Sequence, residues 1–431
     1  MRLVPGAGAS VPAVHRNFSV LLSQGTFYTV AVQLTSVTAV IPFIGAELDA
    51  PGVVVALFVP IYTVGALFGN VFIAQIPRWH TSIVALLLGS VVLQALLIIA
   101  NASVIQFLPE NVSAYPLLLT CAFIGVLSGC SRVIVSLSTS ALLPPERHSS
   151  LLLQQSGYGA VLVTLISAYS AKFLSDDSPG IDNAQLLWVG AAAMVVSAIC
   201  CLALRPERDV VPAQRARMSE LLRDGASRLR GTDWLRHYLV TQVAFTSITL
   251  GSVFYGIYSS TSLGPDNGAL DSILAFIGLG LLAGIGIWSY VRKRFDVRGM
   301  LLCSALIGVC AAVLTLSLLA FRLLPMVWTF GLAMLLTAIA SQAVFPASHD
   351  WMEREVTDDE KVAVLSFTQI VVSVVSIGIA FVFGVIARHG SELWPLAIML
   401  ALNVIAVIAA ARLPIKDEVE PKTGRRKLDE S

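Results

Sequence analysis

Twelve long apolar runs are the feature of this sequence that most restricts its fold. A helix needs about 20 apolar residues to cross the roughly 30 Å hydrocarbon core of a bilayer, because backbone polar groups in lipid find partners only in their own helix. We expect an all-α integral membrane protein, with transmembrane helices over 18–45, 52–76, 82–100, 117–140, 151–173, 185–204, 238–261, 272–291, 299–320, 326–348, 362–386 and 393–412. The first, fourth and tenth runs continue with mildly polar residues, which indicates tilted or broken helices.

The composition excludes most soluble classes. The chain is 56% hydrophobic and only 13% charged, whereas soluble domains carry about 25% charged residues. A soluble enzyme, a nucleic-acid-binding protein and a disordered scaffold are therefore excluded. The six cysteines lie inside apolar runs without the spacing of a metal site. No acid pair, nucleophile–base pair or ligand set is expected at one depth, so we predict no enzyme activity, no metal and no cofactor.

Lysine and arginine are distributed unevenly between the two sides of the predicted membrane protein. Twelve crossings place both termini on the same side, which receives 24 of the 28 basic residues. The other side receives Lys172, Arg322 and Arg388, and Arg132 falls inside a span. By the positive-inside rule, both termini are cytoplasmic. We expect a multi-pass protein of the plasma (inner) membrane.

The longest predicted loop, 205–237, divides the chain into halves. It carries eight arginines and five acidic residues. Met218, Leu221, Leu222 and Leu229 share one helical face, which favours an amphipathic helix on the inner membrane surface, with a solvated linker as an equally supported alternative. The expected organisation is a cytoplasmic N-terminal segment, a six-helix bundle, a cytoplasmic central loop, a second six-helix bundle and a charged cytoplasmic tail, over 1–17, 18–204, 205–237, 238–412 and 413–431.

The two halves repeat the same features at a nearly constant offset. Gly65 and Gly69 recur 215 residues later as Gly280 and Gly284, and Gln155 recurs as Gln369 after 214 residues. A duplication of six spans in the same order predicts two pseudo-symmetric bundles that are related by an axis along the membrane normal. Alternating-access carriers commonly have such repeats, with the binding site between the halves near the bilayer midplane.

Over residues 16–412 the chain resembles the major facilitator superfamily. The resemblance rests on the 6+6 layout, the basic central loop, the short loops after the second and eighth spans, and the segments 129–133 and 143–147 around the fourth-to-fifth span connection. The family's signature loop has a glycine, three residues, then Asp-Arg, one residue, Gly and Arg. Here 69–78 keeps a glycine and a base but has no acid, and Lys293 occupies the position of the acid after the eighth span. The resemblance implies a twelve-helix secondary transporter and leaves the subfamily open.

A polar face on the fourth span holds the strongest candidate for solute binding. Arg132 is the only ionised residue deep in a predicted span, and Ser128 and Ser136 lie one turn on either side of it. An arginine at a helix centre costs at least about 2.5–3.5 kcal/mol on insertion scales, so it usually has a partner or a function. Its planar donors suit an anionic or carbonyl-bearing solute. The alternative is that it snorkels to the interface or caps carbonyls of a broken helix.

Other polar residues are further candidates for the lining of a solute cavity. They are Gln24 and Tyr28 on the first span, Gln154, Gln155 and Tyr158 on the fifth, Gln242 and Thr246 on the seventh, and Gln369 on the eleventh. The competing interpretation is that they hold helices together through hydrogen bonds worth about 0.6 kcal/mol each.

The sequence shows no carboxylate deep in a span that would carry protons. Asp350, beside His349 at the inner end of the tenth span, is the nearest candidate for coupling, although a salt-bridge cluster at the inner surface is favoured. No Walker-type phosphate loop is present, which argues against ATP-driven transport.

We therefore expect a monomeric secondary active or facilitative transporter of a small organic solute, working by alternating access. Protons are one candidate coupling ion, and a facilitator or exchanger fits equally well. A multidrug efflux antiporter is the alternative within transport. However, the Gly-Pro pattern that is typical of drug–proton antiporters does not follow residues 157–159. The altered signature loops also leave open a transport-inactive member that serves as a membrane receptor or scaffold.

Overall fold

The computed structural model of the chain is helical in nearly all of the part that it describes. The described residues are 11–37, 40–48, 52–75, 82–144, 147–173, 179–205, 218–263, 269–321, 326–356, 364–365, 367–379 and 393–413. The helices are α1 (Val11–Leu34), α2 (Val40–Glu47), α3 (Gly52–Gln75), α4 (Ile83–Phe107), α5 (Glu110–Leu142), α6 (His148–Phe173), α7 (Pro179–Leu202), α8 (Met218–Gly231), α9 (Asp233–Leu263), α10 (Ala269–Ala320), α11 (Val327–Glu355) and α13 (Leu393–Ala411). A further helix, Phe367–Ile379, lies between α11 and α13.

These helices follow the twelve predicted spans in order. α1 and α2 together occupy the first span, α3 to α7 the second to sixth, and α9 the seventh. α10 contains the eighth and ninth spans, and α11, Phe367–Ile379 and α13 are the last three. Among the described residues, seven helices are long and apolar enough to cross a membrane by length and composition. The chain is thus a multi-pass membrane protein.

The first span is broken, as its polar content indicates. α1 ends at Leu34 and α2 begins at Val40. The hydroxyl of Thr35 donates to the carbonyl of Ala31 at 2.8 Å, and such back-bonding by threonine bends helices. In contrast, the fourth span lies in one continuous helix of 33 residues, which contains Pro116.

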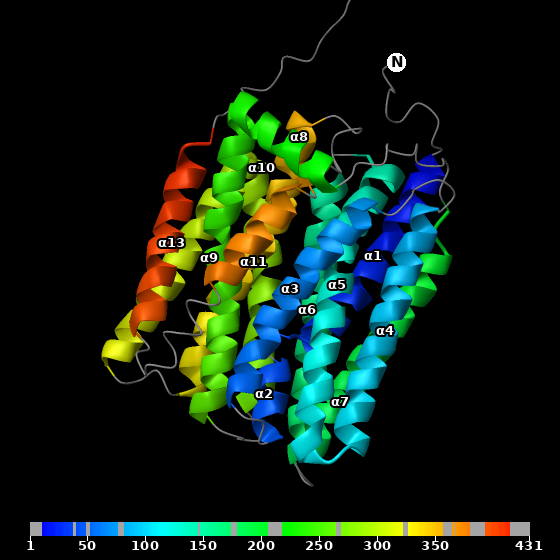
Figure 1. Cartoon of the computed structure of the whole chain (residues 1–431), viewed down its shortest axis with the longest axis vertical. Coiled ribbons are helices and arrows are strands. Elements are labelled where there is room, and N and C mark those ends of the chain that lie inside the picture. The colour runs from blue at the N-terminus through cyan, green and yellow to red at the C-terminus, as the bar shows by residue number, and fades with distance from the viewer. Residues whose placement is uncertain are drawn as a thin grey trace, which may run out of the picture.

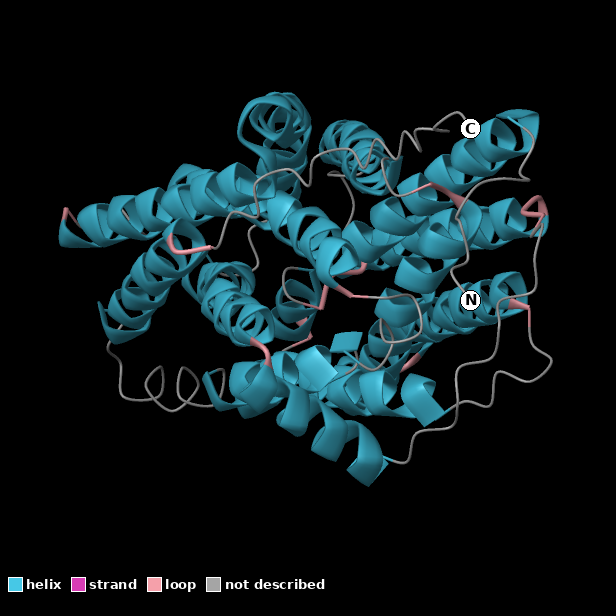
Figure 2. Cartoon of the chain, turned by 90° about the horizontal axis from the view of Figure 1, so that it is seen from above, coloured by secondary structure: helices cyan, strands magenta, loops and turns pink. Residues whose placement is uncertain are grey.

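The helices pack mainly within two halves. In the first half α3 packs against α5, and α7 packs against α1 and α4. In the second half α10 packs against α11 and α13, and α9 packs against α11 and α13. The halves meet where α6 contacts α10 and α11, and where α2 contacts α9. Figure 2 shows this assembly from above, with many of the helices steeply inclined to one another.

Four glycines bring α3 and α5 into backbone contact. A Cβ atom at Gly65 or Gly69 of α3 would overlap the carbonyl oxygen of Ala122 or Val126 of α5. Reciprocally, Gly125 and Gly129 of α5 lie against carbonyls of α3. Small residues let transmembrane backbones approach closely, so van der Waals packing replaces the hydrophobic effect that lipid cannot supply. The predicted packing role of Gly65 and Gly69 is confirmed.

A kink at Asp296 separates the two spans of α10. Asp296 has φ 53° and ψ −159°, a conformation that residues with a side chain rarely adopt. Its carboxylate forms a bidentate ion pair with Arg354 of α11, with N–O distances of 2.6 and 2.8 Å. Hydrogen bonds from Arg354 lower the pKa of Asp296 below its ordinary value of 3.8. The ion pair therefore stabilises the fold at pH values above the ordinary pKa of 3.8. This contribution is lost as the pH falls through the lowered pKa of Asp296.

Replacing Asp296 by glycine or by alanine separates the backbone effect from the ion pair. Both variants lose the pair with Arg354, but only glycine adopts the positive φ without strain. We expect Asp296→Gly to be more stable than Asp296→Ala by about 1–2 kcal/mol, the reverse of their order inside a regular helix. Thermal unfolding of both purified variants measures the difference. Equal stability of the two would show that the kink does not need this backbone conformation.

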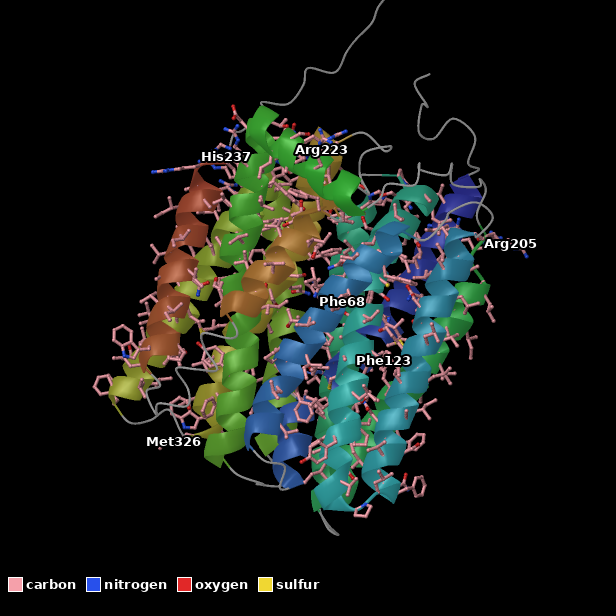
Figure 3. The ribbon with its side chains drawn as sticks, viewed as in Figure 1. Phe68, Phe123, Arg205, Arg223, His237 and Met326 are labelled. Atoms are coloured by element: carbon pink, nitrogen blue, oxygen red, sulfur yellow. The ribbon has the colours of Figure 1, made fainter. Side chains whose placement is uncertain are left out.

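The surface follows the pattern that a bilayer requires. Figure 3 shows the exposed rings of Phe68 and Phe123 part-way along α3 and α5, whereas Arg205, Arg223 and His237 lie toward one end. That end also carries α8 (Figure 1), and we call it the α8 end; the opposite end, where α2 lies, is the α2 end. Exposed apolar side chains along the flanks match a lipid environment, and basic side chains match an interface.

The helix expected in the central loop is present as α8. It contacts α3 of the first half and α9 of the second. Gly225 of α8 lies directly against the ring of Phe367, so that a Cβ atom there would overlap the ring. α8 therefore packs on the ends of other helices in addition to any contact with a membrane surface.

Candidate functional site

The polar face of α5 contacts α11 of the second half at one point and α3 of the first half at another. Ser136 is buried, and its hydroxyl lies 2.6 Å from Nε2 of His349 on α11. Ser128, two turns away, forms a 2.8 Å hydrogen bond with the hydroxyl of Tyr62 on α3. Residues four apart share a helical face, so Arg132 between them projects from the face that Ser136 presents to α11.

Arg132 is exposed, although Ser136 one turn away is buried. Tyr28 of α1 lies near this part of α5, because its hydroxyl donates to Gln94, which in turn donates to Ser131, the residue before Arg132. The halves therefore touch at Ser136, while the side chain of Arg132 stays accessible on the same face. An accessible cation therefore lies one helical turn from a contact between the halves.

The two candidates on α1 take part in contacts within the first half. The amide of Gln24 donates to Ser197 of α7 at 3.1 Å, and the Ser197 hydroxyl donates to the carbonyl of Gln24 at 3.0 Å. The hydroxyl of Tyr28 donates to Oε1 of Gln94 on α4 at 3.2 Å, and Nε2 of Gln94 donates to Ser131 of α5 at 2.6 Å. The structure thus brings Tyr28 near Arg132 and places Gln24 in the α1–α7 interface.

The three candidates on α6 have different surroundings. Gln155 is buried and donates to the carbonyl of Leu21 on α1 at 2.7 Å. Gln154 donates to Ser150 of its own helix at 3.2 Å, and Tyr158 is exposed. The candidates of the second half are equally dispersed. Gln242 donates to Ser348 of α11, Thr246 donates to the carbonyl of Gln242 at 3.3 Å, and Gln369 is half-buried.

Toward the α8 end, a set of polar contacts that we call the polar gate joins the two halves. Glu353 of α11 accepts a hydrogen bond from Ser140 of α5 at 2.9 Å, and its Oε2 lies 2.8 Å from Nδ1 of His148 on α6. The gate also includes the pair Ser136–His349 described above. About two turns before His349 on α11, Gln342 donates to Ser156 of α6 at 3.1 Å. The gate therefore consists of Ser136, Ser140, His148, Ser156, Gln342, His349 and Glu353.

An apolar contact accompanies the polar gate. Phe367 and Ile370 are buried against Leu67 and Val71 of α3. This contact also joins the first half to the second, because Phe367–Ile379 belongs to the second half. Asp350, the other candidate for coupling, lies 3.6 Å from Arg292 of α10, in a pair inside the second half.

Sequence reasoning missed most of the gate. Ser140, His148, Ser156, Gln342 and Glu353 were not among its candidates, because their partners lie about 200 residues away along the chain. One local signal was available, since His349 and Glu353 are four residues apart and share a face of α11. The remaining contacts depend on how the halves dock.

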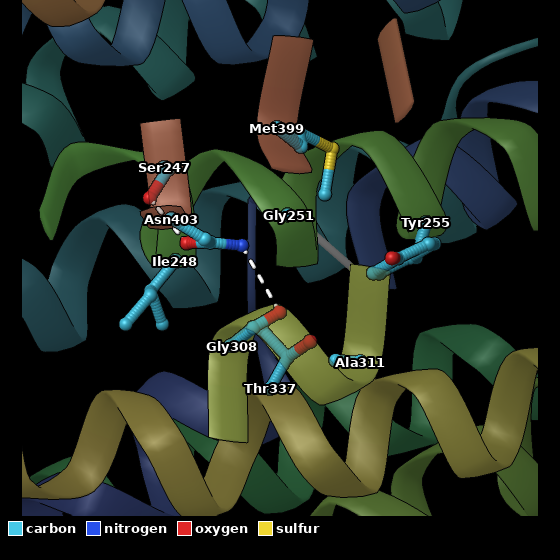
Figure 4. Close-up of a pocket in the computed structure, with 9 residues that line it drawn as sticks. All are labelled: Ser247, Ile248, Gly251, Tyr255, Gly308, Ala311, Thr337, Met399 and Asn403. Atoms are coloured by element: carbon cyan, nitrogen blue, oxygen red, sulfur yellow. Dashed lines mark hydrogen bonds between the residues drawn. The ribbon is translucent and has the colours of Figure 1, made fainter. Parts of the chain in front are cut away.

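A small cavity lies inside the second half, away from the gate. It has a volume of about 10 Å³ and lies among α9, α10, α11 and α13 (Figure 4). Asn403 at its edge accepts a hydrogen bond from Ser247 at 2.5 Å and donates one to the carbonyl of Gly308 at 3.0 Å. The space suits about one water molecule, so we assign it no solute.

Comparison with known sequences finds relatives over nearly the whole chain. No family model matches. The uncharacterized proteins Mb2232 of Mycobacterium bovis and Rv2209 of Mycobacterium tuberculosis are each 30% identical over 417 residues, which cover 96% of this chain and 80% of theirs.

Comparison with solved structures finds transporters of one fold. The outward-conformation structure of FucP, described as a major facilitator superfamily transporter, aligns with a TM-score of 0.62 at 13% identity, over 92% of this chain and 98% of FucP. The proton:xylose symporter XylE gives 0.66 at 12% identity, over 94% and 97%. A bacterial homologue of the iron transporter ferroportin gives 0.64 at 14% identity, over 92% and 98%. The predicted all-α fold with two six-helix bundles is confirmed. The chain thus belongs to the family of the mycobacterial proteins Mb2232 and Rv2209, and its fold is that of the major facilitator superfamily.

Proposed function

We propose that the protein is a monomeric secondary transporter that moves a small organic solute across the plasma membrane by alternating access, with both termini in the cytoplasm. The observation that carries this proposal is the position of Arg132, an accessible cation one helical turn from the polar gate. In this orientation the α8 end faces the cytoplasm, and the gate closes the solute pathway on that side.

The contacts within and between the halves support a rocking motion. Inside each half the interfaces include backbone-to-backbone packing, as between α3 and α5, that leaves no room for sliding. Between the halves the gate consists of side-chain hydrogen bonds, which exchange for water at a net cost of about 0.5–1.5 kcal/mol each. The inter-half contacts are therefore the ones that open reversibly, and the halves move as rigid bodies.

The chemistry of Arg132 suggests the class of solute. A guanidinium offers five donors in a plane, which match carboxylate, phosphate or paired carbonyl oxygens. Tyr28, which lies near the part of α5 that carries Arg132, adds a hydroxyl that hydrogen-bonds to Gln94 in the present state. We infer an anionic or carbonyl-bearing solute that lies between α5 and the second half.

The structural neighbours support transport as the class of function. FucP is described as a fucose:proton symporter of E. coli, and XylE as a proton:xylose symporter. At such a low sequence identity, the similarity supports a shared fold but does not identify the substrate. We assign Asp350 to the ion pair with Arg292 and leave protons as one candidate for the coupling ion.

Substitution of Arg132 tests the proposal. Small organic anions are first screened for stabilisation of the purified protein, because a solute that binds only the folded state raises its apparent stability. Flux of the radiolabelled hits is then measured in proteoliposomes. Loss of a charged hydrogen-bond partner costs about 1.5–3 kcal/mol, so we expect Arg132→Gln to lower the apparent affinity by about 10- to 100-fold.

Arg223→Gln is the matched control, because Arg223 is exposed on α8 (Figure 3). We expect it to transport as the wild type does. Normal flux in Arg132→Gln would refute the role of Arg132. Transport of apolar cations without dependence on Arg132 would instead favour a multidrug antiporter, and a folded wild type without flux for any solute would favour a receptor or scaffold.

A further inference from the structure

The polar gate contains three side chains of the kinds that bind transition metals. His148 comes from α6 of the first half, and His349 and Glu353 come from α11 of the second. One potential ligand atom from each lies within 4.8 Å of the other two. Their side chains are nearly buried, with 1%, 3% and 7% exposure. The cluster is thus compact, mostly shielded from water and shared between the halves.

The hydrogen bonds of His148 determine which of its nitrogens faces the cluster. Nε2 lies 2.9 Å from the carbonyl oxygen of Leu143, which only accepts, so Nε2 carries a hydrogen and donates it. In a neutral imidazole, Nδ1 then presents a lone pair. That lone pair would face the carboxylate of Glu353, whose Oε2 lies 2.8 Å away. Two acceptors at this distance require a cation, either a proton or a metal ion, between them.

His349 is oriented in a similar way, but its outer partner is a hydroxyl, which can donate as well as accept. Its Nε2 lies 2.6 Å from the hydroxyl of Ser136, and its Nδ1 lies 3.7 Å from Oε1 of Glu353. In both histidines, therefore, the outer nitrogen is held by an oxygen and Nδ1 turns toward the same carboxylate. Metal-binding histidines almost always show this pattern, because an outer hydrogen bond fixes the tautomer and the orientation of the ring.

We propose that His148, His349 and Glu353 form a binding site for a divalent transition metal, with Zn²⁺ as the ion that best suits the ligands. Two imidazoles and one carboxylate are a ligand set that zinc accepts, with water in the fourth position. Coordination requires the ligand atoms, which lie within 4.8 Å of one another, to move closer together, since Zn–N and Zn–O bonds are about 2.0–2.2 Å long. Neither calcium nor magnesium is expected, because both prefer oxygen ligands.

Binding at this site clamps the polar gate. The metal joins one ligand from the first half to two from the second, so it binds the closed arrangement better than any arrangement in which the halves have separated. An ion with such a preference shifts the population toward the closed state. On the proposed function, Zn²⁺ is therefore an inhibitor that holds the pathway closed at the α8 end; the binding itself does not depend on transport.

Titration of the purified full-length protein with Zn²⁺ tests the site. The protein is stripped of metal with a chelator, and binding is measured by isothermal titration calorimetry and by the shift in Tm. We expect one Zn²⁺ per chain and a higher Tm for the wild type. His148→Gln, His349→Gln and Glu353→Gln each remove a ligand and should abolish saturable binding. His237→Gln and Glu355→Gln are the matched controls and should bind as the wild type does.

Ser136→Ala provides a milder test that keeps all three ligands. It removes only the outer hydrogen bond of His349. Loss of such an outer partner typically weakens metal binding by about 10- to 100-fold, and we expect a loss in this range. The proposal is overturned if the wild type shows no saturable Zn²⁺ binding, in which case a proton joins His148 to Glu353. Binding that persists in His148→Gln and His349→Gln would overturn it too.

A distance measurement tests the clamp separately from transport. Spin labels are placed at Arg205→Cys in the first half and Arg412→Cys in the second, both exposed at the ends of their helices. The cysteines that are not buried, Cys200, Cys303 and Cys310, are replaced by serine. We expect Zn²⁺ to increase the fraction of short label-to-label distances in the protein with an intact site. In the Glu353→Gln variant, Zn²⁺ should leave the distribution unchanged. Binding without this change would refute the clamp, and failure of the transport assay alone would touch only the proposed function.

Discussion

Replacing Gly69 by alanine is expected to destabilise the protein by about 1–3 kcal/mol or more, the range of an overpacked core. The added methyl group would overlap the carbonyl oxygen of Val126 on α5. A side chain moves aside at small cost, but here the neighbour is helix backbone, which shifts only together with the whole of α5. We therefore expect a lower Tm and a lower yield of monodisperse protein in size-exclusion chromatography.

Gly89→Ala is the matched control for this prediction. Gly89 lies on α4, and a Cβ atom there would meet no other atom within 4 Å. Alanine is the better helix former, so this variant is expected to be as stable as the wild type or more stable by about 0.5–1 kcal/mol. If Gly69→Ala unfolds at the temperature of Gly89→Ala, then α3 and α5 do not approach as closely as the structure shows.

Glu353→Gln is expected to shift the protein toward states that are open at the α8 end. The carboxylate accepts a hydrogen bond from Ser140 and contacts Nδ1 of His148, each on the first half. A hydrogen bond to a charged group is worth about 1.5–3 kcal/mol. Loss of even one such hydrogen bond changes the ratio of closed to open molecules by about tenfold or more. The label pair at Arg205 and Arg412 measures this as a larger long-distance fraction, in chelator-treated samples without metal.

Glu355→Gln controls for the loss of a negative charge near the same end of α11. Glu355 lies two residues beyond Glu353, and none of the gate hydrogen bonds described above involves it. The distance distribution of the Glu355→Gln variant should match that of the wild type. Identical distributions for Glu353→Gln and the wild type would mean that these contacts do not determine whether the halves close.

Much of the fold was predictable from the sequence because a bilayer imposes simple rules. The apolar runs set the number of helices, and Gly65, Gly69 and their repeats at Gly280 and Gly284 indicated close helix packing as well as a duplicated plan. The structure confirms this plan and shows Gly65 and Gly69 against backbone carbonyls. In contrast, the kink at Asp296 had no clear sequence signal, because an aspartate with positive φ is held by Arg354 from another helix.

The candidate site was less predictable, because polarity alone does not tell which neighbour a side chain meets. Gln24 and Gln155 have the same chemistry as residues that line cavities, yet both form hydrogen bonds inside the first half. Glu353 lies beyond the end of the tenth predicted span, yet its side chain is nearly buried between the halves. This difference depends on the docking of α11 against α6, which no local pattern encodes.

The position of α8 has a mechanical consequence. This helix belongs to the covalent link between the halves, yet it touches α3 on one side, and α9 and Phe367 on the other. α8 therefore bridges the two halves. If the halves separate at this end, α8 must lose its contacts either with α3 or with α9 and Phe367. On the proposed function, the connecting segment thus limits the amplitude of the motion, and its contact with α3 influences how fast the protein transports its solute.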